Sequence, residues 1–105
     1  MIGNYRVIVT DDVQNDLDNF VYYLLVEKLN EQAAKALLDD YDASIDRLSE
    51  VAGSLKHLED PELSEYRKLR LTKHDYYFLY RVVGNNAIVD RMFHDLQDLD
   101  KAMKA

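Results

Sequence analysis

The basic side chains of this sequence concentrate in residues 66–94, and their types suit the binding of phosphate. This stretch holds six Lys and Arg residues against two Asp residues, a balance of +4, whereas the other residues hold 7 Lys and Arg against 18 Asp and Glu, a balance of −11. Arginine offers phosphate a bidentate fork, lysine a point charge, and histidine can exchange protons near neutral pH. The stretch therefore predicts a cationic surface. The candidate residues on it are Arg67, Lys68, Arg70, Lys73, Arg81 and His94.

Three consecutive strands are predicted to position these side chains, over residues 66–72, 76–83 and 87–94. The first alternates charged and apolar residues, and the second is rich in the aromatic and β-branched residues that strands favour. Gly84-Asn85-Asn86 follows the second strand and tolerates the positive φ of a tight hairpin. We therefore expect a three-stranded meander.

Alternation along the strands sorts the candidate cations by face. Arg67 lies on the same side of its strand as two leucines, so that side is expected to face inward. Lys68 and Arg70 are then the pair that faces solvent. Arg81 shares its side with apolar and aromatic neighbours, and the pattern leaves its direction open.

Two helices are expected earlier in the chain. Asp11 suits a helix N-cap, Gln14 three residues later resembles a capping box, and apolar residues then recur at helical spacing over residues 11–29. Asn30 suits a second N-cap after a very short connection. Gly53 suits the residue that ends the second helix.

The remaining segments complete a β-α-α-β-β-β order. Residues 5–10 are expected to form a short β-branched strand and residues 54–65 a loop, and residues 95–105 are expected either to form a last helical turn or two or to fray. A helix hairpin on one face of a small sheet buries both apolar surfaces, so we expect one two-layer α+β domain over residues 1–105. Its other sheet face would stay open to solvent or to a ligand. The residues expected to pack beneath the helices are Val13, Leu17, Leu24, Leu37, Leu38, Ile45 and Leu48.

Composition excludes several classes of protein. The chain has 105 residues and no cysteine, so disulfides, thiolate zinc sites and a cysteine nucleophile are ruled out. No apolar run approaches the roughly 20 residues of a membrane span, and no signal peptide is visible, so a cytoplasmic protein without membrane partners is expected. The histidines lack a metal-ligand spacing, and we expect neither metal nor cofactor.

Several short motifs follow one another along nearly the whole chain. They are Thr10-Asp11-Asp12, Asp16-Leu17, Tyr66-Arg67-Lys68-Leu69-Arg70, Phe78-Leu79-Tyr80-Arg81-Val82, Gly84-Asn85-Asn86 and Phe93-His94. Together with the β-α-α-β-β-β order, they resemble the RelE/ParE superfamily of toxins from bacterial type II toxin–antitoxin modules. The resemblance implies a cognate antitoxin that holds the toxin inactive.

The family resemblance implies two different activities. RelE-like toxins cleave messenger RNA in the ribosome, and ParE-like toxins inhibit DNA gyrase. RNA cleavage requires activation of the 2′-hydroxyl, stabilisation of the phosphate and protonation of the leaving oxygen, and none of these steps requires a metal. In that reading Arg70, Arg81 and His94 would be catalytic, and Arg67, Lys68 and Lys73 would contact RNA.

Two positions depart from the nuclease pattern. Tyr77 stands where RelE-like nucleases often carry an arginine, and Asp95 follows His94 where one nuclease branch has an aromatic residue. An acid there would repel a phosphate. A ribosome-dependent endoribonuclease is the favoured reading of the sequence. A gyrase inhibitor and a catalytically inactive relative that only binds its antitoxin are the alternatives.

Overall fold

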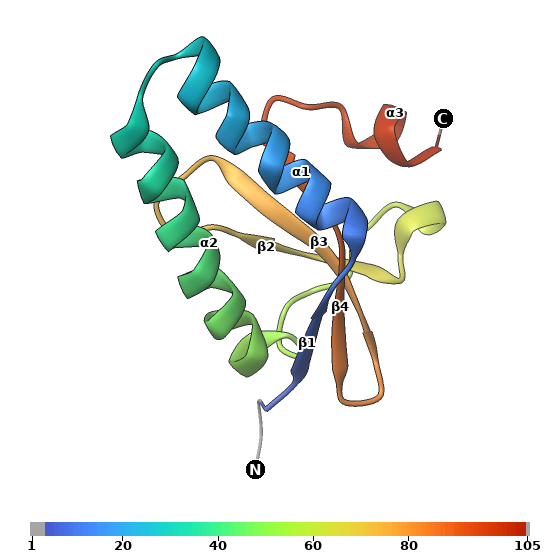
Figure 1. Cartoon of the computed structure of the whole chain (residues 1–105). Coiled ribbons are helices and arrows are strands. Elements are labelled where there is room, and N and C mark those ends of the chain that lie inside the picture. Colours follow the sequence, from blue (N-terminus) through green and yellow to red (C-terminus); the bar gives the residue numbers. More distant parts are fainter. Residues whose placement is uncertain (1–3, 105) are drawn as a thin grey trace.

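The computed structural model describes residues 4–104 and has two helices packed over a four-stranded sheet (Figure 1). The first three residues and Ala105, which ends the segment predicted as a last helical turn, lie outside the described residues. None of the described helices is long and apolar enough to cross a membrane. In chain order the elements are β1 (Arg6–Val9), α1 (Asp11–Tyr22), the π-helical turn η1 (Tyr23–Glu27), α2 (Glu31–Val51), the 3-10 turn η2 (Pro61–Leu63), β2 (Tyr66–Arg70), β3 (Tyr76–Val83), β4 (Asn86–His94) and α3 (Leu99–Lys104).

The sheet has the strand order β1-β4-β3-β2, which confirms the α+β fold and the meander. β1 lies parallel to β4, so the first strand adds to the β4 edge of the meander. The register between β3 and β4 shifts after Leu79, where Asp90 is the extra residue of a β-bulge. Across the bulge the inward-facing positions of β4 shift by one residue, since Ala87 and Val89 before it and Met92 after it all belong to the inner core.

The ends of the helices follow capping chemistry, with one correction. Thr10, not Asp11, is the N-cap of α1, and its side-chain oxygen accepts a hydrogen bond from the Val13 N–H. Thr10 is the N-cap because the helix begins one residue earlier than predicted. Asn30 caps α2 as expected and accepts from the Ala33 N–H at 2.9 Å.

Glycine is required at two positions, Gly84 and Gly53, for different structural reasons. Gly84 has a φ of +60° and forms, with Asn85, the two-residue turn between β3 and β4, as the hairpin pattern predicts. Gly53 follows the C-cap of α2, but it does not adopt a positive φ. A Cβ atom at Gly53 would lie 2.1 Å from the Tyr5 hydroxyl oxygen, so this glycine makes room for a side chain from the start of the sheet.

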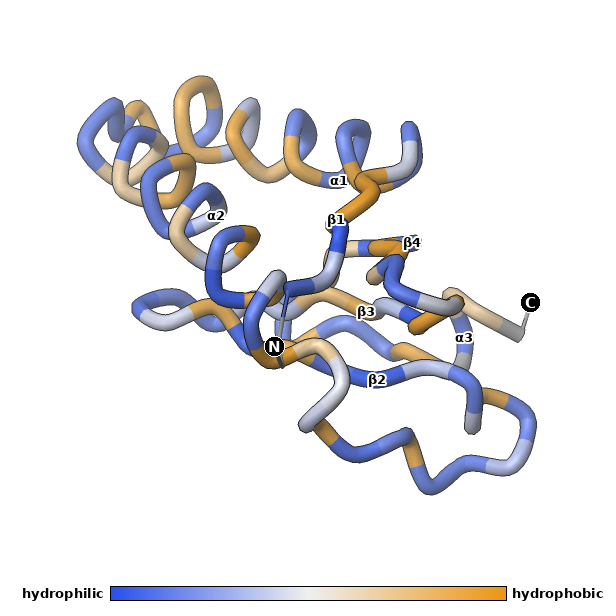
Figure 2. The backbone as a smooth tube through the Cα atoms, turned by 90° about the horizontal axis from the view of Figure 1, so that it is seen from below, coloured by the Kyte–Doolittle hydropathy of each residue, from blue (hydrophilic) through white to orange (hydrophobic). Residues whose placement is uncertain are grey.

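The core lies between the helix hairpin and the inner face of the sheet (Figure 2). Four of the predicted core residues are buried, namely Val13, Leu17, Leu37 and Leu48, and from the sheet they meet residues such as Phe78, Tyr80, Val89 and Met92. Leu24 and Ile45 are half-buried at its edge. The prediction was wrong for Leu38, which is exposed because the α2 stripe runs through its neighbour Leu37.

The outer face of the sheet is not open, contrary to expectation. A second cluster of Tyr77, Leu79 and Phe93 is buried there, and Leu58, Tyr66, Leu99 and Met103 pack against it. Leu99 and Met103 are four residues apart, so they share one face of α3. The C-terminal helix and the loop before β2 therefore cover part of the surface on which the candidate cations were expected to be free. That loop is also not wholly irregular, because it contains η2.

Candidate functional site

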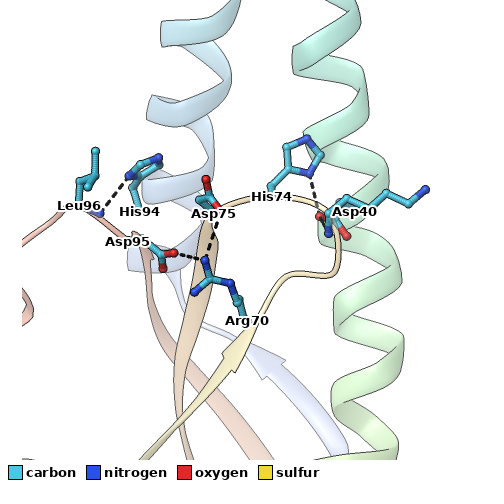
Figure 3. Close-up of polar contacts among 8 residues, drawn as sticks. Asp40, Arg70, His74, Asp75, His94, Asp95 and Leu96 are labelled. Atoms are coloured by element: carbon cyan, nitrogen blue, oxygen red, sulfur yellow. Dashed lines mark hydrogen bonds and ion pairs between the residues drawn. The ribbon is translucent and has the colours of Figure 1, made fainter.

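Arg70 is the centre of a charged network at the end of β2 (Figure 3). Its guanidinium donates to Asp75 at 3.2 Å and also pairs with Asp95. Asp75 and Asp95 come together because the Asp95 N–H donates to the Asp75 carbonyl at 2.9 Å. The Arg70 backbone is fixed in turn, since Arg47 donates to its carbonyl oxygen at 2.6 Å. The Arg70 side chain is partly exposed, but two carboxylates neutralise its charge.

The two lysines of the predicted site lie on either side of Arg70 in the sequence. Lys68 faces solvent, as alternation predicts, and its Nζ atom lies 4.1 Å from the centre of the Tyr77 ring. This cation–π contact places the lysine over the outer apolar cluster. Lys73 is exposed in the β2–β3 loop, where its N–H donates to Asp40 at 2.9 Å. Lys68, Lys73 and Arg70 are therefore the exposed members of the predicted phosphate surface, whereas Arg67, Arg81 and His94 are half-buried.

Asp40 anchors the β2–β3 loop to α2, and sequence reasoning did not single this residue out. Its carboxylate accepts hydrogen bonds from the N–H groups of Thr72 and Lys73 and contacts His74 Nδ1 at 2.8 Å. Burial alone would raise the pKa of Asp40, but the hydrogen bonds and the charge of His74 outweigh burial and lower it below 3.8. The signal was present in the sequence, because Asp40 lies on the buried side of α2 between Leu37 and Tyr41.

Arg67 and Arg81 have structural partners elsewhere. Arg67 is half-buried and donates to the Ala52 carbonyl at 3.0 Å, which agrees with its predicted inward direction. Arg81 pairs with Asp90 at 2.7 Å, and this hydrogen bond, with the charge of Asp90, raises the pKa of Arg81. Arg81 lies opposite Tyr66, whereas Arg70 lies opposite Tyr77. Arg81 is four residues from Tyr77 on β3, so the two arginines are offset by roughly 13 Å along the strands.

His94 lies at the end of β4 and faces α1. Its ring meets the Tyr76 ring edge-on at 5.0 Å between centroids, and Tyr76 meets Phe20 of α1 in the same manner at 4.7 Å. These residues line a groove of about 500 Å³ together with Asn19, Tyr23 and Gln97. His94 pairs with Tyr76 and Arg70 pairs with Tyr77, and because Tyr76 and Tyr77 are adjacent in β3, His94 and Arg70 belong to opposite faces of the sheet.

The hydrogen bonds of His94 fix its tautomer. The Leu96 N–H donates to His94 Nδ1 at 3.1 Å, so in the neutral ring Nε2 carries the proton. In this tautomer Nδ1 is an acceptor and the Nε2–H group is a donor.

The structure brings Arg70, Lys68 and Lys73 to one end of β2 and separates them from Arg81 and His94. Catalytic roles for these residues stay a prediction.

The pair of Asp16 and Arg91 was also missed by sequence reasoning: Arg91 donates twice to Asp16, at 2.8 and 3.0 Å. This pair joins α1 to β4, and the Asp16 hydrogen bond raises the pKa of Arg91. No group of three or more His, Asp or Glu side chains among the described residues is arranged to hold a metal ion.

Comparison with known proteins places this architecture in a family. The model of the ParE toxin of the type II toxin–antitoxin system parDE matches residues 7–99. The chain therefore belongs to the ParE toxin family, which confirms the RelE/ParE resemblance. No curated protein matches the sequence.

Two solved structures share the fold. A chain of the chromosomal ParDE toxin–antitoxin system from P. aeruginosa is 21% identical with a TM-score of 0.69, and the match covers 88% of this chain and 97% of that one. A chain of the RelBE2 toxin–antitoxin complex from Mycobacterium tuberculosis is 23% identical with a TM-score of 0.57, and the match covers 90% of this chain and 93% of that one. At these identities the structures support the fold alone.

Proposed function

We propose that this toxin arrests growth by binding DNA gyrase and that a cognate antitoxin neutralises it. The class of toxin rests on the family match over residues 7–99. Gyrase as the target follows from the resemblance to ParE-like members. The antitoxin follows from the family and from the two similar structures, both of which come from toxin–antitoxin pairs.

The observation that supports binding over RNA cleavage is the pairing of Arg70 with Asp75 and Asp95. A phosphate transition state is stabilised by positive charge that is already aimed at it. Two carboxylates beside Arg70 would repel the phosphate that the arginine would have to hold. The other two candidates do not compensate, since Arg81 is about 13 Å away along β3 and His94 faces α1.

The cationic surface suits a different role. Lys68 and Lys73 are exposed near the paired Arg70, on a protein whose net charge is −7. Local charge of this kind accelerates and orients the encounter with a protein partner, and it requires no catalytic geometry. The acidic remainder of the chain disfavours unspecific binding to nucleic acid.

The test is a supercoiling assay with purified gyrase and the purified toxin. We expect the toxin to inhibit supercoiling and the cognate antitoxin to reverse the inhibition. The His94→Ala variant should inhibit as well as the wild type, because binding needs no proton transfer. Uninhibited gyrase at excess toxin, from a folded protein that still binds its antitoxin, would overturn the proposed target.

A ribosome-dependent endoribonuclease is the competing function that the sequence favoured. Under that function Arg70→Ala, Arg81→Ala and His94→Ala should each lower cleavage by about 10²–10³-fold, the usual effect of removing one transition-state donor. The two functions therefore differ in the response of a single variant, His94→Ala, which separates them even if both assays give a signal.

A further inference from the structure

The two carboxylates that pair with Arg70 occupy the same atom of its guanidinium (Figure 3). Arg70 Nη2 donates both to Asp75 Oδ1, at 3.2 Å, and to Asp95 Oδ2. A guanidinium holds a phosphate bidentately through Nη2 together with either Nε or Nη1, so Nη2 belongs to both forks. Asp16 shows one of these forks, since its carboxylate accepts from Arg91 Nε and Nη2. With Nη2 occupied twice, Arg70 offers neither fork to another anion.

The sheet, and not Arg70, holds the two carboxylates in place. Asp75 directly precedes β3 and Asp95 directly follows β4, one position beyond the ladder pair of Tyr76 with His94. The Asp95 N–H donates to the Asp75 carbonyl at 2.9 Å and so continues the ladder. An amide of the same shape can therefore replace either carboxylate without a change in the backbone.

Stability does not explain two acids at this point of the sheet. Like charges at facing positions of neighbouring strands destabilise a sheet. One carboxylate would suffice to pair with Arg70, and exposed ion pairs add little to stability. This pair is exposed, because the side chains of Arg70 and Asp75 are 53% and 75% accessible. The second acid therefore indicates a role in what this surface binds.

Lys68 brings a second cation to the same place. It lies in register with Leu79, but its Nζ atom is 4.1 Å from the centre of the Tyr77 ring, and Tyr77 is the cross-strand partner of Arg70. The Lys68 side chain therefore leans toward Arg70. Among the residues that the structure describes, no carboxylate forms an ion pair with Lys68.

The charges of these four side chains cancel. Lys68 and Arg70 carry +2 and Asp75 and Asp95 carry −2, so the local balance is zero. Neutral amides in place of the two acids would leave +2 and free both forks of Arg70. Two exposed cations side by side on one strand suit an extended ligand with a row of phosphates, and a strand of nucleic acid is such a ligand.

We propose that Asp75 and Asp95 are specificity-determining residues that keep the phosphates of single-stranded nucleic acid away from Lys68 and Arg70. The surface around Arg70 is thus an anion site that the protein itself closes. This exclusion does not depend on gyrase as the target, since it rests on the doubly occupied Nη2 atom and the cancelled charge. A failed supercoiling test would overturn the proposed function and leave the exclusion of nucleic acid standing.

Fluorescence anisotropy with a labelled single-stranded RNA oligonucleotide tests the proposal, at about 0.1 M salt and then across a salt series. Asp75→Asn/Asp95→Asn should bind the RNA at least about tenfold more tightly than the wild type, because two charges that repel phosphate at close range are removed. The logarithm of its affinity should fall with that of the salt concentration with a slope of about −0.7 to −1.4, as for one or two phosphate contacts.

Two further variants assign the gain to the local site. Asp18→Asn/Glu27→Gln raises the net charge by the same amount at exposed positions of α1 and η1, and it should bind RNA like the wild type, because salt screens charges beyond about 10 Å. Adding Arg70→Ala to Asp75→Asn/Asp95→Asn should remove most of the gain. Urea midpoints show that the variants fold. Asp95→Asn alone, which keeps one acid beside Arg70, should show a smaller gain and serves if the double variant does not fold.

Three results would contradict the proposal. The first is equal RNA binding by the wild type and the folded Asp75→Asn/Asp95→Asn variant. The second is a gain that Asp18→Asn/Glu27→Gln reproduces, because net charge alone would then explain it. The third is a double variant that binds inorganic phosphate, titrated in parallel, but not RNA, because the site would then accept a free ion and not a strand.

Discussion

The two faces of the sheet are built by different means. The inner face forms one continuous apolar core with α1 and α2, in which Phe78 and Tyr80 are fully buried. The outer face has a small apolar cluster around Tyr77, and charged pairs such as Arg70 with Asp95 and Arg81 with Asp90 surround it. Apolar burial stabilises the fold far more than partly exposed ion pairs do. The inner face therefore supplies most of the stability, and the outer face contributes less to it.

The largest effect should come from the inner face. Leu37→Ala removes a fully buried side chain and should lower the free energy of unfolding by about 2–5 kcal/mol, as core truncations do. Leu38→Ala is its matched control, since Leu38 is exposed, and it should change stability by less than about 0.5 kcal/mol. Urea titrations of both variants measure the difference. Equal effects would show that α2 packs through a different stripe.

The next effect concerns the loop that links the two faces. Asp40→Ala leaves the N–H groups of Thr72 and Lys73 without their acceptor, and each unsatisfied buried group costs about 1–3 kcal/mol. Water can reach this partly buried loop, so we expect a total near the lower end of that range. Thermal unfolding measures the loss. An unchanged stability would mean that Asp40 does not anchor the loop.

The same residue predicts a dependence on pH. The pKa of Asp40 is lower in the folded protein than its ordinary value of 3.8, so its stabilisation is fully present above that value and is lost as pH falls through the folded pKa. Between about pH 5 and pH 2 the wild type should therefore lose more stability than Asp40→Asn, which cannot ionise. Parallel stability curves over this window would contradict the assigned cause.

A smaller effect is expected from the cover of the outer face. Replacing Leu99 and Met103 together by alanine should lower the free energy of unfolding by about 1–2 kcal/mol, because both side chains are only half-buried over Tyr77 and Phe93. The loss should be smaller than that of Leu37→Ala. A loss as large as the Leu37→Ala effect would show that the two faces contribute equally to the fold.

The smallest effect on stability should come from the charged network. The Arg70 side chain is about half exposed, and exposed pairs are typically worth about 0.2–1 kcal/mol. Arg70→Ala should therefore change stability by less than about 1 kcal/mol, and the difference from the wild type should shrink as salt is added. A much larger loss, independent of salt, would make Arg70 a structural residue and not a surface one.

The contrast between the two faces of the sheet also explains which features could be predicted from the sequence. Strand alternation and helical spacing predicted the α+β order, the hairpin at Gly84 and most of the inner core, because each depends on residues close in sequence. The pairing of Arg70 with Asp95 joins residues 25 positions apart, and that of Asp16 with Arg91 joins residues 75 apart. No local pattern encodes such partners, so the sequence identified the candidate cations, and Asp95 as an acid close to the site, but not the pairing of Arg70 with Asp75 and Asp95.

Single-turnover cleavage of messenger RNA on programmed ribosomes tests most directly whether the paired cations do chemistry. If the toxin acts by binding, the RNA should stay intact with the wild type at a concentration that fully inhibits gyrase supercoiling. Cleavage by the wild type that falls about 10²–10³-fold in both Arg70→Ala and His94→Ala would contradict this function and establish a nuclease site in spite of Asp75 and Asp95.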